Sequence, residues 1–117
     1  TVKLGNNSFR DFQYSKDAVK MAVLLLEKGE FGEVYNMGSE GGIKIYDLAY
    51  LIGKLLGHEK VEVIVDEARV RPWEIWHLQS DNTKLYNAIG KQEPTSLEIA
   101  LQNTIDYFNK NNNKWDW

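Results

Sequence analysis

The chain has 117 residues with a net charge of -3 at pH 7, 43% hydrophobic and 26% charged residues, and no cysteine. This balance predicts one soluble domain over residues 1–117 and argues against a nucleic-acid partner, which usually needs a basic face. No apolar run approaches the ~20 residues of a membrane-spanning helix, so we expect no membrane partner. The lack of cysteine excludes disulfides and thiolate metal sites but leaves the compartment open; our expectation is the cytoplasm.

The beginning of the chain predicts a short extended segment followed by a helix. Residues 9–14 alternate in part between apolar and polar side chains, as a strand does. Asp17 is expected to cap a helix that runs to about Lys28, and Gly29 supplies its end. Residues 18–26 are apolar nearly all round, so we expect other structure to cover this helix on more than one side.

A strand, a glycine-rich turn and a second helix are predicted next. Residues 33–37 predict the strand, and the flexible segment 38–42 follows it. Residues 45–56 carry apolar side chains at helical spacing, which predicts an amphipathic helix that ends at Gly57. Segment 38–42 lacks the G-x-G-x-x-G order of a dinucleotide-binding loop, so we interpret it as a turn and expect no cofactor in this chain.

The second half of the chain predicts alternating strands and helices. They are, in order, a strand over residues 61–65, a loop over 69–72, a short strand over 75–79, a helix over 82–89 and a last helix before a polar tail over about 111–117. Asp81 is expected to cap the short helix, and Thr95 and Glu98 have capping-box spacing at the start of the last one. The fold class is therefore α/β (mixed α+β), several helices with three or four short strands.

Two arginine-containing segments lie roughly sixty residues apart. One runs Arg-Asp-Phe-Gln-Tyr-Ser-Lys-Asp from Arg10, and the other runs Arg-Pro-Trp-Glu-Ile from Arg71. Each places a guanidinium, a planar fork of donors that matches two phosphate oxygens at once, beside a stiffening residue and an acidic neighbour. Two such forks suit a diphosphate.

Four blocks in chain order resemble the C-terminal substrate-binding part of the extended short-chain dehydrogenase/reductases, the NAD-dependent epimerase/dehydratase family. They are Arg10 to Asp17 (Arg-Asp-aromatic-x-x-Val-x-Asp in the family), Val34 to Ser39 (Val-Tyr-Asn-Ile-Gly-Ser), Asp66 to Pro72 with Glu74 (the approach to Arg-Pro-x-Glu-Val), and Leu78 to Lys84 (Leu-Gln-Gly-Asp-x-Thr-Lys). The later blocks are most similar to GDP-mannose 4,6-dehydratase and GDP-4-keto-6-deoxymannose reductase. Together the blocks cover essentially the whole chain.

The resemblance implies a nucleotide-diphosphate-sugar substrate. Arg10 and Arg71 are the positions that grip its diphosphate in the family, and Glu74 lies near the ribose or holds Arg71. In the intact family, NAD(P) and the catalytic Tyr/Lys pair belong to an N-terminal Rossmann half, which is absent here. We therefore expect a substrate-binding fragment that neither binds NAD(P) nor is active alone, and we assign no catalytic residue.

The arginines also have an ordinary alternative, which is pairing at the surface. Arg10 would then pair with Asp11 or Asp17, and Arg71 with Glu74, without any ligand. We interpret Asp11 as a loop anchor and Asp17 as the helix cap. Trp73 and Trp76 flank Glu74 and either stack on a base or ring or fill the groove.

Two other patterns imitate catalytic or metal sites. Tyr50 and Lys54 have the Tyr-x-x-x-Lys spacing of the short-chain dehydrogenase catalytic pair, in which the lysine lowers the phenol pKa. The match is local, on the polar face of a predicted helix, so we expect no catalysis from it. His58 and His77 have no partner at metal-ligand spacing, and we expect no metal site.

A second class of function remains open beside the binding of a nucleotide sugar. The apolar helix over residues 18–26 and the strand at Val34 resemble elements that pack against the missing Rossmann half. Left uncovered, they would form an apolar patch, which predicts a homodimer or a partner-binding interaction module. A third possibility is one half of a split enzyme whose Rossmann half is a separate chain. The sequence does not decide the sugar, the base or the type of reaction.

Overall fold

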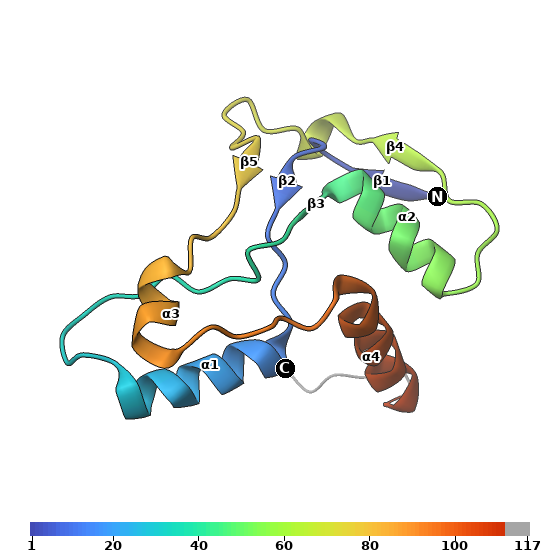
Figure 1. The fold of residues 1–117 in the computed structure, drawn as a ribbon. Helices are drawn as coiled ribbons and strands as arrows, with labels where there is room; N and C mark the ends of the chain where they lie inside the picture. Colours follow the sequence, from blue (N-terminus) through green and yellow to red (C-terminus); the bar gives the residue numbers. More distant parts are fainter. Residues whose placement is uncertain (112–117) are drawn as a thin grey trace.

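The computed structural model describes residues 1–111 and has the mixed α/β fold that the sequence predicts (Figure 1). The strands are β1 (Val2–Leu4), β2 (Phe9–Arg10), β3 (Ile43–Lys44), β4 (Val63–Val65) and β5 (His77–Leu78), and the helices are α1 (Ser15–Lys28), α2 (Ile45–Leu55), α3 (Thr83–Ile89) and α4 (Leu97–Lys110), with a 3₁₀ turn at Glu67–Arg69. All but the first residue of the predicted polar tail lies outside the described residues.

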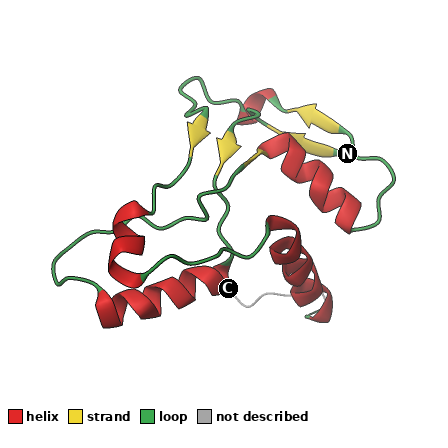
Figure 2. Ribbon diagram, in the orientation of Figure 1, coloured by secondary structure: helices red, strands yellow, loops and turns green. Residues whose placement is uncertain are grey.

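The five strands form two small sheets, which Figure 2 shows gathered at one end of the molecule. In one sheet β1 runs parallel to β4, with Val2 opposite Val63. In the other, β2 lies between antiparallel β3 and parallel β5, and the ring of Phe9 stacks on that of His77 at 4.3 Å. Because β5 directly follows the Arg71 segment and pairs with the strand that carries Arg10, this sheet brings the two arginine motifs together.

Helices α1 and α3 pack side by side away from the strands and enclose the main core (Figure 1). That core contains Met21 of α1 with Leu85 and Ile89 of α3, all at most 3% exposed. The remaining sides of α1 are not covered: Val19 is 62% exposed and Leu26 is 88% exposed. The helix is thus as apolar as the sequence indicates. We expected other structure to pack on more than one of its sides, and in the described residues only the side toward α3 is buried.

Helix α2 lies near the smaller sheet and contacts α4. Lys44 precedes α2 and supplies no side-chain cap; the loop between β1 and β2 does so instead, because Tyr46 N donates to Asn7 Oδ1 at 3.0 Å. The whole arrangement is open. Its accessible surface is 8830 Å², whereas a compact monomer of this mass exposes about 6500 Å².

The predicted strand over residues 33–37 is wrong, since this segment is a loop. Lys84 of α3 holds it through side-chain contacts, donating to Glu33 Oε2 at 2.6 Å and to Val34 O at 2.9 Å. The bonds from Lys84 thus hold this segment in place of the backbone hydrogen bonds that a strand would make. Strands β1 and β3 were not predicted. They have three and two residues, which is too short for an alternation of apolar and polar side chains to be recognised.

Two helix starts also differ from the prediction, and they share one cause. Helix α1 begins at Ser15, so Asp17 lies inside its first turn and caps nothing. Its carboxylate instead accepts from Thr95 N at 2.8 Å and from Thr95 Oγ1 at 2.9 Å. Thr95 is thereby removed from the expected capping box, and Ser96 caps α4 by accepting from Ile99 N. A contact between distant residues has replaced two local ones.

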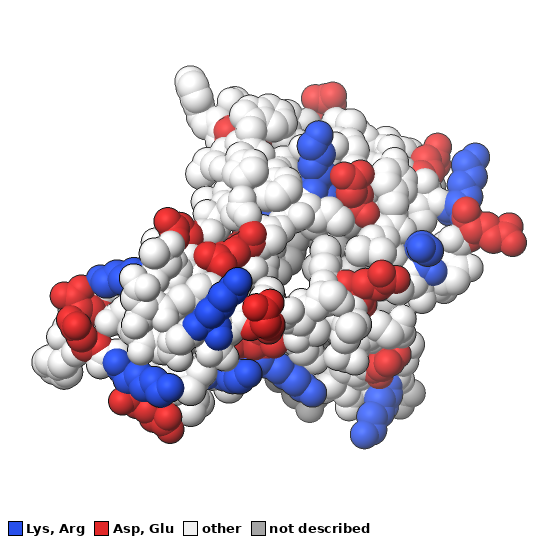
Figure 3. Space-filling model, in the orientation of Figure 1, with Lys and Arg blue, Asp and Glu red and all other residues white. Residues whose placement is uncertain are grey.

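The charged side chains on the face in Figure 3 are of both signs. On the face in Figure 3, basic and acidic side chains are interspersed and form no continuous basic patch. Within residues 1–111, no helix combines the length and apolar character that crossing a membrane requires.

Candidate functional site

Arg10 forms the centre of a polar cluster that joins the two arginine motifs. Its Nη1 donates to Ile75 O at 2.6 Å and to Phe9 O at 2.8 Å, and its Nη2 donates to Glu74 Oε1 at 2.5 Å. The Arg10 and Glu74 side chains are 22% and 8% exposed. A bond between a guanidinium and a carboxylate is charge-assisted and strong when partly buried. Arg10 is therefore a cation held in a fixed position.

Asn6 extends this cluster to Arg71. Its Nδ2 donates to Arg71 O at 3.1 Å and to Glu74 Oε2 at 3.1 Å. One asparagine in the loop before β2 thus fixes both ends of the Arg71–Glu74 turn. The sequence does not predict the role of Asn6, because that role depends on a contact between positions that are distant in the chain; the Gly-Asn-Asn turn composition is its one local signal.

The ion pairs that we considered as an alternative do not form within residues 1–111. Glu74 pairs with Arg10 and not with Arg71, while the carboxylates of Asp11 and Asp17 accept bonds from serine and threonine groups. The idea that Glu74 holds Arg71 is therefore wrong in this structure.

The side chain of Arg71 is exposed and makes no hydrogen bond or ion pair in the described part of the chain. A guanidinium carries five N–H donors. Three bonds occupy Arg10, which leaves two of its donors, and all five of Arg71 remain available. Arg10 is a fixed cation, and Arg71 is a free one whose backbone carbonyl belongs to the same cluster. Such a pair is suited to an anion with several oxygens.

Asp11, the residue after Arg10, anchors a different loop. Its carboxylate accepts from Ser39 N at 3.0 Å, Glu40 N at 3.2 Å, Ser80 N at 3.1 Å and Ser80 Oγ at 2.8 Å, and also from Ser39 Oγ. Burial would raise the pKa of Asp11, but the bonds from Ser39 and Ser80 outweigh it and hold the pKa below its ordinary value. The interpretation of Asp11 as a loop anchor is confirmed.

The glycine-rich segment after that anchor has no free backbone donors over residues 38–41. Gly38 N donates to Asn82 Oδ1 at 3.1 Å, and Gly41 N donates to Ser39 Oγ at 3.1 Å. The two amides between them, Ser39 N and Glu40 N, donate to the carboxylate of Asp11. A loop that binds phosphate needs outward-facing N–H groups. The amides of residues 38–41 are therefore already used inside the chain, in agreement with the interpretation of this segment as a turn.

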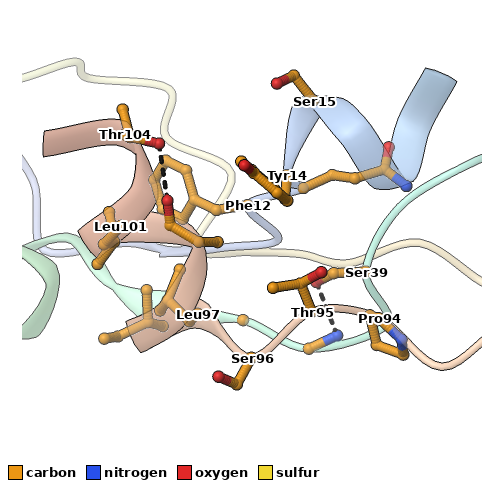
Figure 4. Close-up of a pocket in the computed structure, with 15 residues that line it drawn as sticks. Phe12, Tyr14, Ser15, Ser39, Pro94, Thr95, Ser96, Leu97, Leu101 and Thr104 are labelled. Carbon is orange, nitrogen blue, oxygen red and sulfur yellow. Dashed lines mark hydrogen bonds between the residues drawn. The ribbon is translucent and has the colours of Figure 1, made fainter. Parts of the chain in front are cut away.

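A cavity of about 530 Å³ lies between the start of α1, the segment around Ser39 and the first turns of α4 (Figure 4). Its wall includes the apolar side chains of Phe12, Leu97 and Leu101. Two of the polar groups on it are already paired: Thr104 Oγ1 donates to Ala100 O at 2.7 Å, and Thr95 Oγ1 donates to Asp17 Oδ1 at 2.9 Å. Arg10, Arg71 and Glu74 do not line this cavity, so it offers no charged contact to a phosphate.

The remaining patterns from the sequence are the Tyr50–Lys54 spacing and the two histidines. Tyr50 is 45% exposed on α2, and neither its side chain nor that of Lys54 has a hydrogen-bond partner between residues 1 and 111. Over the same range, no group of three His, Asp or Glu side chains could hold a metal ion.

Comparison with known proteins identifies relatives of this chain. No family model matches it. It is 31% identical over 109 residues to a trifunctional UDP-glucose 4,6-dehydratase/3,5-epimerase/reductase of Arabidopsis thaliana, covering 93% of this chain and 16% of that protein. It is 30% identical over 102 residues to a GDP-L-fucose synthase of Sinorhizobium fredii, covering 87% of this chain and 31% of the relative. The chain therefore spans a sixth to a third of these proteins.

Solved structures agree with this relationship. The UDP-glucose 4-epimerase of Thermotoga maritima, solved with UDP-glucose, superimposes with a TM-score of 0.82 at 29% identity, over 94% of this chain and 35% of the epimerase. A dTDP-glucose 4,6-dehydratase of Bacillus anthracis, solved with NAD, has the same fold at a TM-score of 0.81. The homologues are thus nucleotide-sugar dehydratases, epimerases and reductases, which confirms the family that the four sequence blocks predict.

Proposed function

We propose that this chain, a relative of the nucleotide-sugar dehydratases, epimerases and reductases of the extended short-chain dehydrogenase/reductase family, binds a nucleoside-diphosphate sugar. Arg10 and Arg71 hold its diphosphate in this proposal. Glu74 orients Arg10 and stands beside the ribose. The chain supplies the substrate-binding part and is not active alone.

One observation carries the proposal, and it is the cluster that joins the two motifs through Asn6 and Glu74. Segments sixty-odd residues apart in the chain converge, and Arg71 keeps every donor of its side chain available. Hydrogen bonds to charged groups contribute about 1.5–3 kcal/mol each. We expect roughly millimolar affinity, which corresponds to a binding free energy of about -4 kcal/mol.

The nature of the nucleotide is proposed from the motifs. The segment from Asp66 to Glu74 is most similar to the GDP-sugar enzymes, and GDP is our first choice of ligand. Relatives are named for UDP-, dTDP- and GDP-sugars alike, so all three belong in the test. In this proposal NAD(P) chemistry is supplied by a Rossmann half, and the internally bonded amides of residues 38–41 support this division.

Titration of GDP-, UDP- and dTDP-sugars followed by NMR tests the proposal. We expect amide shifts at residues 71–76 and around β2 that fade in Arg71→Ala and weaken with added salt. Arg69→Ala is the matched control, because this nearby arginine is 66% exposed and bonds to Asp66 at 3.1 Å. If shifts appear elsewhere, or if both variants behave alike, the arginines are ordinary surface charges.

A second function, association with another polypeptide, is favoured by the exposed apolar face of α1. Val19, Val23 and Leu26 follow helical spacing at 62%, 48% and 88% exposure. We propose a homodimer at micromolar concentration, or pairing with a separate Rossmann chain, through this face. Sedimentation should show the dimer, and Leu26→Glu should dissociate it while Leu56→Glu should not. A monomeric wild-type protein would exclude the homodimer.

A further inference from the structure

The turn from Arg71 to Trp76 is fixed at both ends to β2 and to the loop before it. Asn6 holds Arg71 O, Arg10 holds Ile75 O, and Phe9 N donates to Trp76 O at 2.8 Å. Pro72 restricts the backbone further by fixing its φ angle. The side chains on this turn are therefore carried by a backbone with little freedom to rearrange.

Trp73 lies in the middle of this turn with its indole in solvent. The residue is 92% exposed and makes no ring, cation–π or hydrogen-bond contact within residues 1–111. By contrast, the rings of Phe9 in β2 and His77 in β5 stack on each other and are used internally. Tryptophan is usually well buried, so a fixed turn that presents one to solvent indicates a surface for binding.

Arg71 lies two residues before Trp73, at a backbone distance of at most about 7 Å. Its guanidinium is also without a partner in the described chain. A free cation and a free flat ring at this spacing match a molecule that carries a phosphate at one end of a ribose and an aromatic base at the other. The second tryptophan, Trp76, is 64% exposed and is bonded into the start of β5 through its backbone.

We infer that Trp73 is a stacking platform for the base of the bound nucleotide, next to the phosphate contact of Arg71. This rests on the proposed function and adds to it a residue that recognises the base. Stacking on an indole uses the face of the base and not its hydrogen-bonding edge. Trp73 therefore raises the affinity for nucleotides of any base over that for phosphate alone.

The test compares UDP and GDP with inorganic pyrophosphate, using the full 117-residue chain. Trp73→Ala should weaken both nucleotides by about tenfold and leave pyrophosphate unchanged. Trp73→Phe should retain most of the affinity, while nucleotide quenching of the indole emission should fall. Trp76→Ala is the matched control and should leave the ratio of nucleotide to pyrophosphate affinity as in the wild type.

Three contradicting outcomes can be told apart. If wild-type protein binds neither pyrophosphate nor nucleotides, the proposed function itself fails. If pyrophosphate binds but Trp73→Ala keeps the preference for nucleotides, only the platform is overturned. If Trp73→Ala shifts the oligomeric state instead of the affinity, the indole contacts a polypeptide and the inference is wrong.

Discussion

Two neighbouring residues of opposite charge, Arg10 and Asp11, each hold a distant loop, and the two loops differ in what they leave available. Asp11 holds the glycine-rich loop, where every amide from 38 to 41 has an internal acceptor. Arg10 holds the turn from Arg71 to Trp76, where a guanidinium and an indole remain without partners in the described chain. The glycine-rich loop, whose composition suggests phosphate binding, is therefore structural. The turn from Arg71 to Trp76 has no glycine, and it keeps the free guanidinium donors of Arg71.

The largest effect should come from removing the anchor of the closed loop. Asp11→Ala leaves three backbone N–H groups without their acceptor, so we expect a loss of about 2–4 kcal/mol in the free energy of unfolding at pH 7. Chemical denaturation measures it. Asp66→Ala is the control, because that carboxylate accepts only from Ala68 and Arg69 nearby and should cost less than about 1 kcal/mol.

The same anchor predicts a dependence on pH. Since the folded state lowers the pKa of Asp11, its stabilisation is complete above the unfolded pKa of about 3.9 and is lost as the pH falls through the folded value. The gap between wild type and Asp11→Ala should therefore shrink between pH 5 and the lowest pH at which the fold persists. A gap that stays constant over that range would show that the charge is not what holds the loop.

A smaller effect should come from loosening the open turn. Asn6→Ala removes the bonds to Arg71 O and Glu74, for an expected loss of about 1 kcal/mol and faster amide exchange at residues 71–76. Asn7→Ala is a close control, because Asn7 caps α2 instead. It should cost a similar amount of stability but leave exchange in the turn unchanged. Equal exchange in both variants would contradict the role of Asn6.

The smallest effect should come from Glu40, which is the described non-glycine residue with a positive φ, at 58°. Its carboxylate accepts from Asn82 N at 3.0 Å. Glu40→Gly loses this bond but relieves about 1 kcal/mol of backbone strain, so the net change should be within about 0.5 kcal/mol. Glu40→Ala keeps the strain and loses the bond, and should be about 1 kcal/mol less stable than wild type. If Glu40→Ala is more stable than Glu40→Gly, the loop is not strained.

The sequence predicts those parts of the fold that local patterns determine. The helix over residues 45–56 is correct within a residue because apolar spacing and Gly57 define it together. The sequence could not predict contacts between distant segments, such as those of Asp17 with Thr95 and of Lys84 with Val34. For the candidate site, the motifs gave Arg10, Arg71 and Glu74, but the partner of Glu74 and the linking Asn6 depend on the pairing of β2 with β5.

The most direct test of the central claim asks whether Arg71 contacts the second phosphate of a nucleotide. Affinities of UDP and UMP are measured for wild type and for Arg71→Ala by NMR titration at low salt. If Arg10 and Arg71 share one diphosphate, UDP binds wild type about tenfold more tightly than UMP, and the advantage disappears in the variant. An advantage of the same size in both proteins would contradict the account.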